Sequence, residues 1–254
     1  MNLVVHLFTA FSTKARGKRA AFFRGCFELG DTTRVLDLGS QTGSGIHAVL
    51  RGTEVQPHNV YIADIDAALL EEGRARYGFT PVLVKESGPL PFPDGYFDVV
   101  FCNSVIEHVT LPKNEVWKER SGARFRAEAR RRQKEFATEI RRLGRQYFVQ
   151  TPYRHFPIEP HSWLPFAGWL PRWLLLPVLR LSHRVWVTKT NPDWYLMNRR
   201  ELAELFAEAR IVDEKCWGLT KSIMAVKSAH AAPWQARPPP QGVGNEPPSS
   251  AQPA

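Results

Sequence analysis

The chain has 254 residues, 43% of them hydrophobic, and a formal net charge of +9 at pH 7. This length suits one domain with some additions, and the apolar fraction is enough for a sizeable core, which excludes a wholly disordered chain. The three cysteines, Cys26, Cys102 and Cys216, lie far apart, without even pairing or metal-ligand spacing. A disulfide scaffold is therefore excluded, and a reduced, cytoplasmic protein is expected.

The first eleven residues are apolar, and a basic run over residues 14–24 follows them. They lack the basic start and the small-residue cleavage site of a signal peptide. We expect instead one helix that lies over the mouth of a ligand site formed by the next segment.

The segment over residues 35–45 reads VLDLGSQTGSG. It predicts a buried strand over 35–38, a glycine-rich turn and a helix over 46–50. Glycines allow a tight turn and a close approach of a ligand, because they lack a Cβ atom and tolerate positive φ. The helix that follows directs free N–H groups at the turn. Asp37, two residues before the first glycine, would repel the pyrophosphate that a GxGxxG turn binds. It suits a ligand with an amino group, which points to S-adenosylmethionine.

This strand and turn resemble the first motif of class I S-adenosylmethionine-dependent methyltransferases, D-x-G-x-G-x-G. Aligned on Asp37, Gly39 and Gly43 match, and Gln41 replaces the middle glycine, where it would crowd the cofactor unless it points away. The resemblance implies an α/β fold: a Rossmann-like, mostly parallel sheet of seven strands with helices on both faces and a final antiparallel hairpin. It also implies S-adenosylmethionine as cofactor and S-adenosylhomocysteine as product. Asp37, Gly39, Ser40 and Gly43 would frame the methionine end.

A second strand is predicted from Val60, and it ends in Asp64. In a βαβ unit, the acid that ends the second strand binds the ribose hydroxyls, so Asp64 and the adjacent Ile65 are candidate cofactor contacts. Asp66 is predicted to be the N-cap of a helix over 67–77. The alternative is that Asp64 and Asp66 both serve only to cap the following helix.

A third strand is predicted over residues 81–84, and a polar turn follows it. In the resembling family an acid here binds the adenine amino group, and Glu86 and Ser87 occupy that place. The pattern LPFPDG-x-FD-V-V over 90–100 predicts a turn and a fourth strand. With SVIEHV over 104–109, it resembles the type 11-like branch of small-molecule methyltransferases. Asn103 would lie beside the methyl group.

Residues 113–145 contain 12 basic residues against 5 glutamates. We expect a basic helical insertion over 112–134. An amphipathic helix then follows, marked by Phe136, Ile140 and Leu143, before a fifth strand at 147–150. The insertion is interpreted as a solvated charged helix or, alternatively, as a contact with an anionic membrane. Nucleic acid is disfavoured as a partner, because no aromatic and basic stacking pattern accompanies the charge.

The loop after the fifth strand reads QTPYRHFPIEPHSWLPF over residues 150–166. It resembles the TP-(N/Y)-R-x-FP-(I/V)-EPH signature of a bacterial methyltransferase subgroup. Methyl transfer needs an aligned nucleophile, and a base if that nucleophile starts protonated. His161 is the candidate base, Glu159 would orient it, and His108 is a second candidate, while His155 carries less weight.

A rigid clamp with a structural histidine is the alternative for this loop. No metal is expected, because the two histidines and one acid of the loop lack a clear third strong ligand.

Residues 163–181 read WLPFAGWLPRWLLLPVLRL. Arg172 and three prolines disfavour a transmembrane span. We expect two short helices that form a lid, within a substrate loop and lid over 151–190. The interleaved tryptophans and arginines also suit the headgroup layer of a membrane.

The remaining chain predicts a helix over 198–210, with Asn198 as N-cap and Glu201 completing a capping box. Two strands then form the final hairpin, and the domain ends at residue 227. The Pro-rich tail over 228–254 is predicted to be disordered.

The functional hypothesis is methyl transfer to an oxygen, nitrogen or carbon of a small, lipophilic acceptor. A methyltransferase-like scaffold that does not bind the cofactor is one alternative, motivated by Gln41. A peripheral membrane-binding protein is the other.

Overall fold

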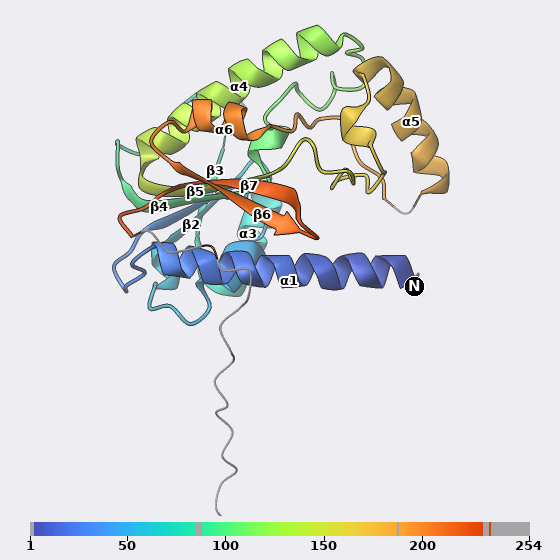
Figure 1. Ribbon diagram of the computed structural model, residues 1–254. Coiled ribbons are helices and arrows are strands. Elements are labelled where there is room, and N and C mark those ends of the chain that lie inside the picture. Colours follow the sequence, from blue (N-terminus) through green and yellow to red (C-terminus); the bar gives the residue numbers. More distant parts are fainter. Residues whose placement is uncertain (1–2, 85–87, 187, 231–233, 235–254) are drawn as a thin grey trace, which may run out of the picture.

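The computed structural model describes residues 3–84, 88–186, 188–230 and 234. Its centre is a seven-stranded sheet with the strand order β3-β2-β1-β4-β5-β7-β6 (Figure 1). Strands β1 to β5 are parallel, and β7 runs antiparallel to both β5 and β6. The predicted fold class is therefore confirmed. The strands are β1 (Val35–Leu38), β2 (Val60–Asp64), β3 (Thr80–Leu83), β4 (Phe97–Asn103), β5 (Gly144–Pro152), β6 (Arg210–Cys216) and β7 (Leu219–Lys227).

Helices cover both faces of the sheet (Figure 1). On one face, α1 and α2 bury residues such as Phe23 and Ile46 with β1, β4 and β5; on the other, α4 and α6 bury Ile140 and Leu202. The helices are α1 (Leu3–Cys26), α2 (Ser44–Leu50), α3 (Ala67–Tyr77), α4 (Gly122–Leu143), α5 (Arg172–Val185) and α6 (Arg199–Leu205), with 3₁₀ turns η1 (Pro57–Asn59), η2 (Ile106–His108) and η3 (Ala167–Trp169).

The register of the sheet decides which residues share the edge where the parallel strands end. Leu38, the last residue of β1, pairs with Ala63 and with Cys102. Asn103, the last residue of β4, pairs with Gln150 of β5. The glycine turn, η2 and the loop after β5 therefore leave the sheet at one edge, where ligands of open α/β sheets bind.

Several predicted bounds are off by two or three residues, such as the start of α2 at Ser44 and the start of β5 at Gly144, and two helices differ more. The basic insertion and the amphipathic helix are one helix, α4, because Phe125, Ala129 and Gln133 continue its buried face toward the N-terminus. Helix α6 ends at Leu205 instead of residue 210, since the fully buried Phe206 leaves the helical conformation just before β6 begins.

The charge of α4 is largely paired. Within the helix, Arg131 and Arg132 bind Glu128, and Arg142 binds Glu139. The pairing at Glu128 lowers its pKa to about 2, chiefly through the hydrogen bonds from Arg131 and Arg132. These glutamates were already counted in the charge balance of the segment, and the surplus of positive charge is offset in part by acids outside it, through the pairs of Arg130 with Glu201 and Arg141 with Glu208.

Glu201 links α6 to two other elements. Its carboxylate accepts the backbone N–H of Asn198, which completes the predicted capping box, and binds Arg130 of α4 at 2.8 Å and Arg154 at 3.0 Å. Burial raises the pKa of Glu201, but these hydrogen bonds and charges outweigh burial and lower it.

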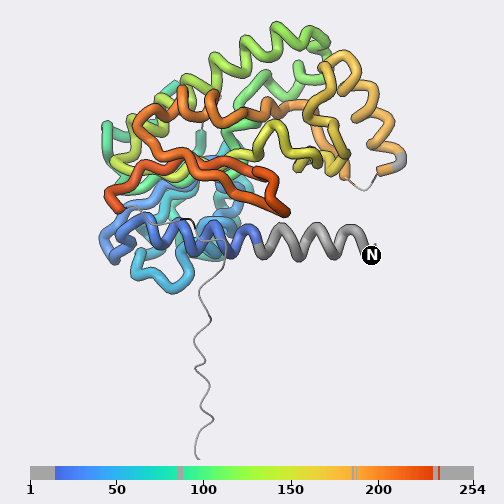
Figure 2. The backbone as a smooth tube through the Cα atoms, viewed as in Figure 1, coloured from blue at the N-terminus to red at the C-terminus, as the bar shows by residue number. Residues whose placement is uncertain are grey.

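The segment predicted as a lid folds as two short helices, η3 and α5, beyond the ends of the strands (Figure 2). Arg172, at the start of α5, is buried and donates hydrogen bonds to the backbone oxygens of Glu119, Pro192 and Val116. Its guanidinium also lies 3.6 Å from the centre of the Phe125 ring. Arg172 therefore attaches α5 to the segments around Glu119 and Pro192. Among the described residues, no helix combines the length and apolar character needed to cross a membrane.

Most of the tail that was predicted to be disordered, residues 231–233 and 235–254, lies outside the described residues. Trp234 is described, and its ring packs against Phe22 of α1 at a centroid distance of 5.0 Å.

Candidate functional site

The glycine turn after β1 has the backbone that the sequence predicted. Gly39 and Gly43 have φ of 72° and 73°, in the left-handed region that favours glycine. A Cβ atom on Gly39 would lie 2.5 Å from Cγ2 of Val105, and one on Gly43 would lie 2.9 Å from Cγ2 of Ile62. The turn is therefore packed against the segment after β4, and glycine is required at position 39 by both sterics and conformation.

Gln41 occupies the place of the missing glycine without changing the turn. Its φ is 52°, so the residue keeps a left-handed backbone, and its side chain is exposed to solvent. Its backbone N–H donates to Oδ2 of Asp64 at 2.8 Å. The substitution leaves the turn intact and joins it to the end of β2.

The two predicted acids lie in different environments. Asp37 is only 4% exposed, and its pKa is raised well above the ordinary value, first by burial and then by the negative charge of Asp64. Asp64 accepts the backbone N–H groups of Gln41 and Asp66. Asp66 accepts from Ala68 and Leu69 N–H, which confirms it as the N-cap of α3.

Two apolar side chains are exposed at the ends of neighbouring strands. Ile65 follows β2 and is 59% exposed, and Leu83 ends β3 and is 57% exposed. Because Asp64 pairs with Leu83 in the sheet, both side chains belong to the same stretch of edge. Leu83 had no sequence signal of its own. Glu86 and Ser87, the predicted adenine contacts, lie outside the described residues.

Helix α1 reaches this edge through Arg19. Its Nη1 atom donates to Oδ1 of Asn103 at 2.7 Å and to Oε1 of Gln150 at 3.0 Å, and its Nε atom lies 3.4 Å from Glu214. The amide oxygen of Asn103 is thus held by α1. Arg19 was part of the basic run noted in the sequence, but its partner depends on the sheet.

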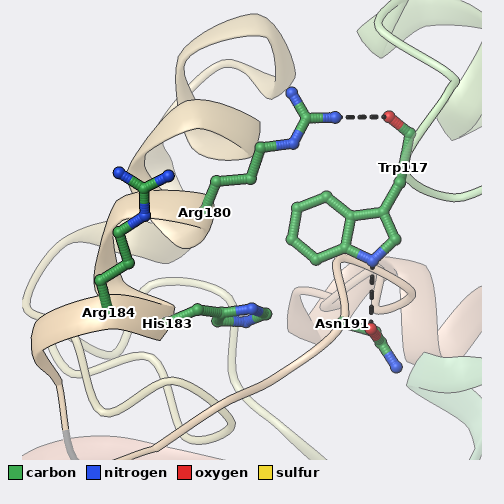
Figure 3. Close-up of a pocket in the computed structure, with 5 residues that line it drawn as sticks. All are labelled: Trp117, Arg180, His183, Arg184 and Asn191. Carbon is green, nitrogen blue, oxygen red and sulfur yellow. Dashed lines mark hydrogen bonds between the residues drawn. The ribbon is translucent and has the colours of Figure 1, made fainter.

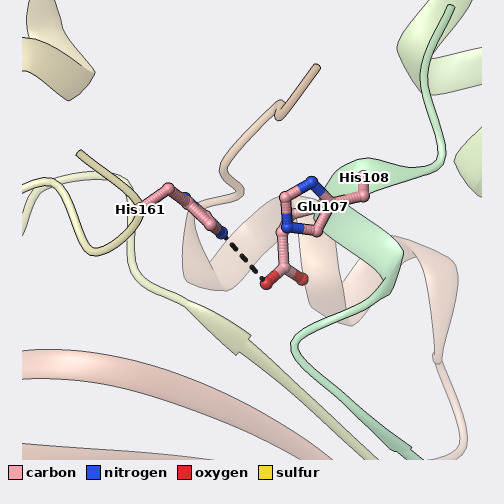
Figure 4. Close-up of side chains that lie close together, drawn as sticks. All are labelled: Glu107, His108 and His161. Carbon is pink, nitrogen blue, oxygen red and sulfur yellow. Dashed lines mark ion pairs between the residues drawn. The ribbon is translucent and has the colours of Figure 1, made fainter. Parts of the chain in front are cut away.

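A second polar cluster gathers where η2 meets the loop after β5. Nδ1 of His161 lies 2.6 Å from Oε1 of Glu159, and its Nε2 lies 3.8 Å from Oε1 of Glu107. The ring of His108 lies 4.6 Å from that of His161, centre to centre. In Figure 4 the ring of His161 points at the Glu107 carboxylate along the dashed ion pair, and the ring of His108 lies beside the Glu107 side chain. The structure therefore brings together His161, Glu159 and His108, and adds Glu107.

Each side chain of this cluster is also fixed by a hydrogen bond or a ring contact with a residue outside the cluster. Oε2 of Glu159 accepts from the backbone N–H and the hydroxyl of Ser162 at 2.6 Å and 2.5 Å. Oε2 of Glu107 accepts from the Thr151 hydroxyl at 3.0 Å. Nδ1 of His108 lies 3.3 Å from Asp193, and the ring of Trp194 stacks on His161. Asp193 and Trp194 carried no signal in the sequence.

The charges of the cluster are coupled. Burial lowers the pKa of His161, but the carboxylates of Glu107 and Glu159 outweigh burial and raise it to about 10. Burial likewise raises the pKa of Glu159, and its bonds to His161 reverse this and lower it. An imidazolium ring, which is protonated on both nitrogens, donates hydrogen bonds and cannot accept a further proton. The role of His161 as a base stays a prediction, and it requires that the ring first lose this proton.

His155 lies apart from the cluster. It is exposed, and its ring lies 5.3 Å from the ring of Tyr153, centre to centre.

A shallow surface pocket lies between α5 and the segment before α4, and none of the predicted site residues lines it (Figure 3). In that pocket Nε1 of Trp117 donates to Asn191 at 3.1 Å.

Comparisons with known proteins agree with this architecture. Residues 36–146 match the family model described as a methyltransferase domain. No curated protein matches the chain. Three solved structures share the fold at a TM-score of 0.50 and 13% identity.

The first is a proposed O-methyltransferase from Nostoc punctiforme, with 84% of this chain and 56% of that chain covered. The chain thus spans little more than half of that protein. The second comes from the complex of the Haloferax volcanii Trm112 methyltransferase activator with a proposed methyltransferase, covering 85% of this chain and 90% of that one. The third is loganic acid methyltransferase with SAH, covering 80% and 74%. The family match spans β1 to the start of β5, and it includes the glycine turn and η2. Residues 36–146 therefore match a methyltransferase domain, and the fold around them is the one that this chain shares with solved methyltransferase structures.

Proposed function

We propose that this protein transfers a methyl group from S-adenosylmethionine to a small, lipophilic acceptor. The observation that carries the proposal is the turn formed by Gly39 and Gly43, which lies between Asp37 and Asp64 at the carboxyl edge of the sheet. The bound cofactor supplies an activated methyl group on a sulfonium centre.

The residues present fit this cofactor at three points. Asp37 is a buried carboxylate whose ionised form is disfavoured, and the cationic amino group of the methionine end would restore it. Each oxygen of Asp64 accepts one backbone N–H and keeps capacity to accept from the ribose hydroxyls. Ile65 and Leu83 are exposed apolar side chains where the flat adenine ring would lie, so its binding would remove them from water.

The acceptor would bind at the cluster of His161 and His108. The imidazolium of His161, fixed by Glu159, would donate a hydrogen bond to an acceptor oxygen and orient it. His108, which is less buried and paired with Asp193, would take the acceptor proton. The contact of Val105 with Gly39 keeps this cluster, three residues further along, adjacent to the cofactor turn.

Calorimetric titration with S-adenosylmethionine and S-adenosylhomocysteine tests the proposal. Asp64→Ala should lower the affinity at least tenfold, because the ribose would lose its acceptor. Asp66→Ala is the matched control: it removes an acid two residues away that caps α3, and should leave the affinity unchanged. Absence of binding by the unaltered protein would contradict the proposal and favour the scaffold alternative.

The acceptor site is tested separately by turnover. His161→Ala should reduce turnover by about 100-fold, the scale of a positioned proton-transfer or hydrogen-bonding group. His155→Ala, in the same loop but exposed and outside the cluster, should keep normal turnover. Equal turnover of the two variants would remove His161 from the reaction.

A peripheral contact with a membrane is the second candidate function. Among the described residues of the lid, the exposed large apolar side chains are Phe166, Trp169, Trp173, Leu181 and Trp186. Tryptophan rings favour the headgroup layer of a bilayer, and a lipophilic acceptor would reach the lid from there.

Co-sedimentation with phosphatidylcholine vesicles tests this contact. Trp173→Ser, which removes a ring 66% exposed, should reduce the bound fraction, whereas Trp217→Ser in the β6–β7 turn should not. Binding that requires anionic lipid and ignores Trp173 would contradict a contact made by the lid.

A further inference from the structure

We propose that Glu107, His108 and His161 form a binding site for a divalent transition metal ion, with zinc as the ion that fits best. Each residue offers one ligand atom, and the three atoms lie within 4.8 Å of one another. The ligands come from η2 and from the loop after β5, elements that the sheet brings together (Figure 4). The proposal does not depend on methyl transfer.

The two histidines are oriented as metal-binding histidines usually are. A carboxylate holds Nδ1 of each ring: Glu159 at 2.6 Å for His161, and Asp193 at 3.3 Å for His108. Such a contact fixes the ring and its tautomer. A metal would bind Nε2 of His161 only after displacing the proton from that atom, so the metal-bound ring and the imidazolium of the proposed acceptor site exclude each other. Glu159 is in turn held by Ser162, so the support extends a further step outward.

Glu107 provides the independent observation. Its side chain is fully buried, and its Oε1 atom has no hydrogen-bond partner within the described part of the chain. The nearest cationic atom, Nε2 of His161, is 3.8 Å away, which exceeds the length of a hydrogen bond. A buried carboxylate oxygen left in this way is unfavourable, and native structures nearly always satisfy it. A metal ion between Oε1 and the two rings would do so.

The ligand set selects the class of ion. Two imidazoles and one carboxylate form a known catalytic zinc set, in which a fourth position stays open. Magnesium and calcium prefer oxygen ligands, so they fit less well. Zinc bonds of about 2.1 Å in tetrahedral geometry place ligand atoms about 3.4 Å apart. The ligand atoms, which lie within 4.8 Å of one another, would therefore approach by up to about 1.4 Å on binding, and the open position would take water or an acceptor oxygen.

Metal titration of the full, tag-free chain after removal of metal by a chelator tests the site. Zn²⁺ binding would be followed by calorimetry, and Co²⁺ binding by its visible spectrum. We expect one ion per chain, and a Co²⁺ spectrum without thiolate charge-transfer bands, which excludes ligation by the three cysteines. Glu107→Gln and His161→Asn should each lower the affinity at least tenfold. His155→Asn, an exposed histidine of the same loop, should bind as the unaltered chain does.

Two results would overturn the inference. Absence of Zn²⁺ and Co²⁺ binding would mean that Glu107 and His161 form an ion pair only. Binding that survives both substitutions would place the metal elsewhere. If Glu107→Gln fails to fold, His108→Asn carries the same test, because the His108 side chain is 33% exposed. Titration of the metal-free chain with S-adenosylmethionine is a separate measurement, so failure of the metal site and failure of the proposed function are distinguishable.

Discussion

The replacement Gly39→Ala tests whether the turn after β1 is packed as the structure shows. The new methyl group would meet Val105 at 2.5 Å and 2.6 Å from its two Cγ atoms. Real Cβ atoms do not approach other carbons so closely, so either Val105 or the turn must move. The residue would also keep φ near 72°, a region that alanine avoids.

Two terms set the expected loss of stability. The left-handed backbone costs about 1–2 kcal/mol for a residue with a Cβ atom. Overpacking against Val105 adds about 1–3 kcal/mol. The free energy of unfolding should therefore fall by roughly 2–5 kcal/mol, a large part of the stability of an ordinary domain.

Urea unfolding followed by circular dichroism measures this change. Gly45→Ala is the matched control, because a Cβ atom there meets nothing within 4 Å and the residue lies in α2. That variant should be as stable as the unaltered protein, or more stable by about 0.5 kcal/mol. In the double variant Gly39→Ala, Val105→Ala the new methyl group no longer meets the Cγ atoms of Val105. The overpacking part of the lost stability should therefore be regained while the backbone part remains, and a double-mutant cycle measures that part.

The reasoning would be refuted by a Gly39→Ala variant whose unfolding free energy matches that of Gly45→Ala. A double variant with no coupling between positions 39 and 105 would refute the contact while leaving the backbone strain.

Three further predictions concern other elements. Asp66→Ala removes the N-cap of α3 and should lower the unfolding free energy by about 1 kcal/mol, measured by urea unfolding, whereas a loss under 0.3 kcal/mol would argue against the cap. Because the folded state lowers the pKa of Glu201, its carboxylate stabilises the fold above the ordinary value of about 4.3, and this stabilisation is lost as the pH falls through the lowered pKa. The stability gap between the unaltered protein and Glu201→Gln should therefore be widest near neutral pH and close on acidification; a gap independent of pH would contradict the ion pairs. Arg172→Met leaves three backbone oxygens without their donor and should cost about 3 kcal/mol and expose the lid to limited proteolysis. The control is Arg180→Met, because the exposed Arg180 donates one hydrogen bond, to the backbone oxygen of Trp117 at 3.3 Å. Equal proteolysis of the two variants would contradict the role of Arg172 in holding α5 in place.

Elements whose signals are local were predictable from the sequence. The cap at Asp66 and the helix over 67–77 were predicted to the residue, and the capping box of Asn198 and Glu201 is present. In both cases the deciding hydrogen bonds join residues at most three positions apart, so no distant part of the chain can change them. The length of α4 was missed, because its first half buries Phe125 with the small Ala129 and the polar Gln133, and one large apolar residue gives no hydrophobic period.

The sequence by itself determined the strand and turn at Asp37 to Gly43, the order of the elements and the residues that form the edge of the sheet. Only the tertiary structure decided which of those residues meet. Glu107 and His161 lie 54 positions apart, and their approach follows from the pairing of Asn103 with Gln150 in neighbouring strands. Arg172 looked like a lipid contact by composition, yet it is buried against three backbone oxygens from other segments. The physical reason is the same in both cases: a side chain takes its charge state and its partners from the groups that folding places around it, and these are set by sheet register and packing.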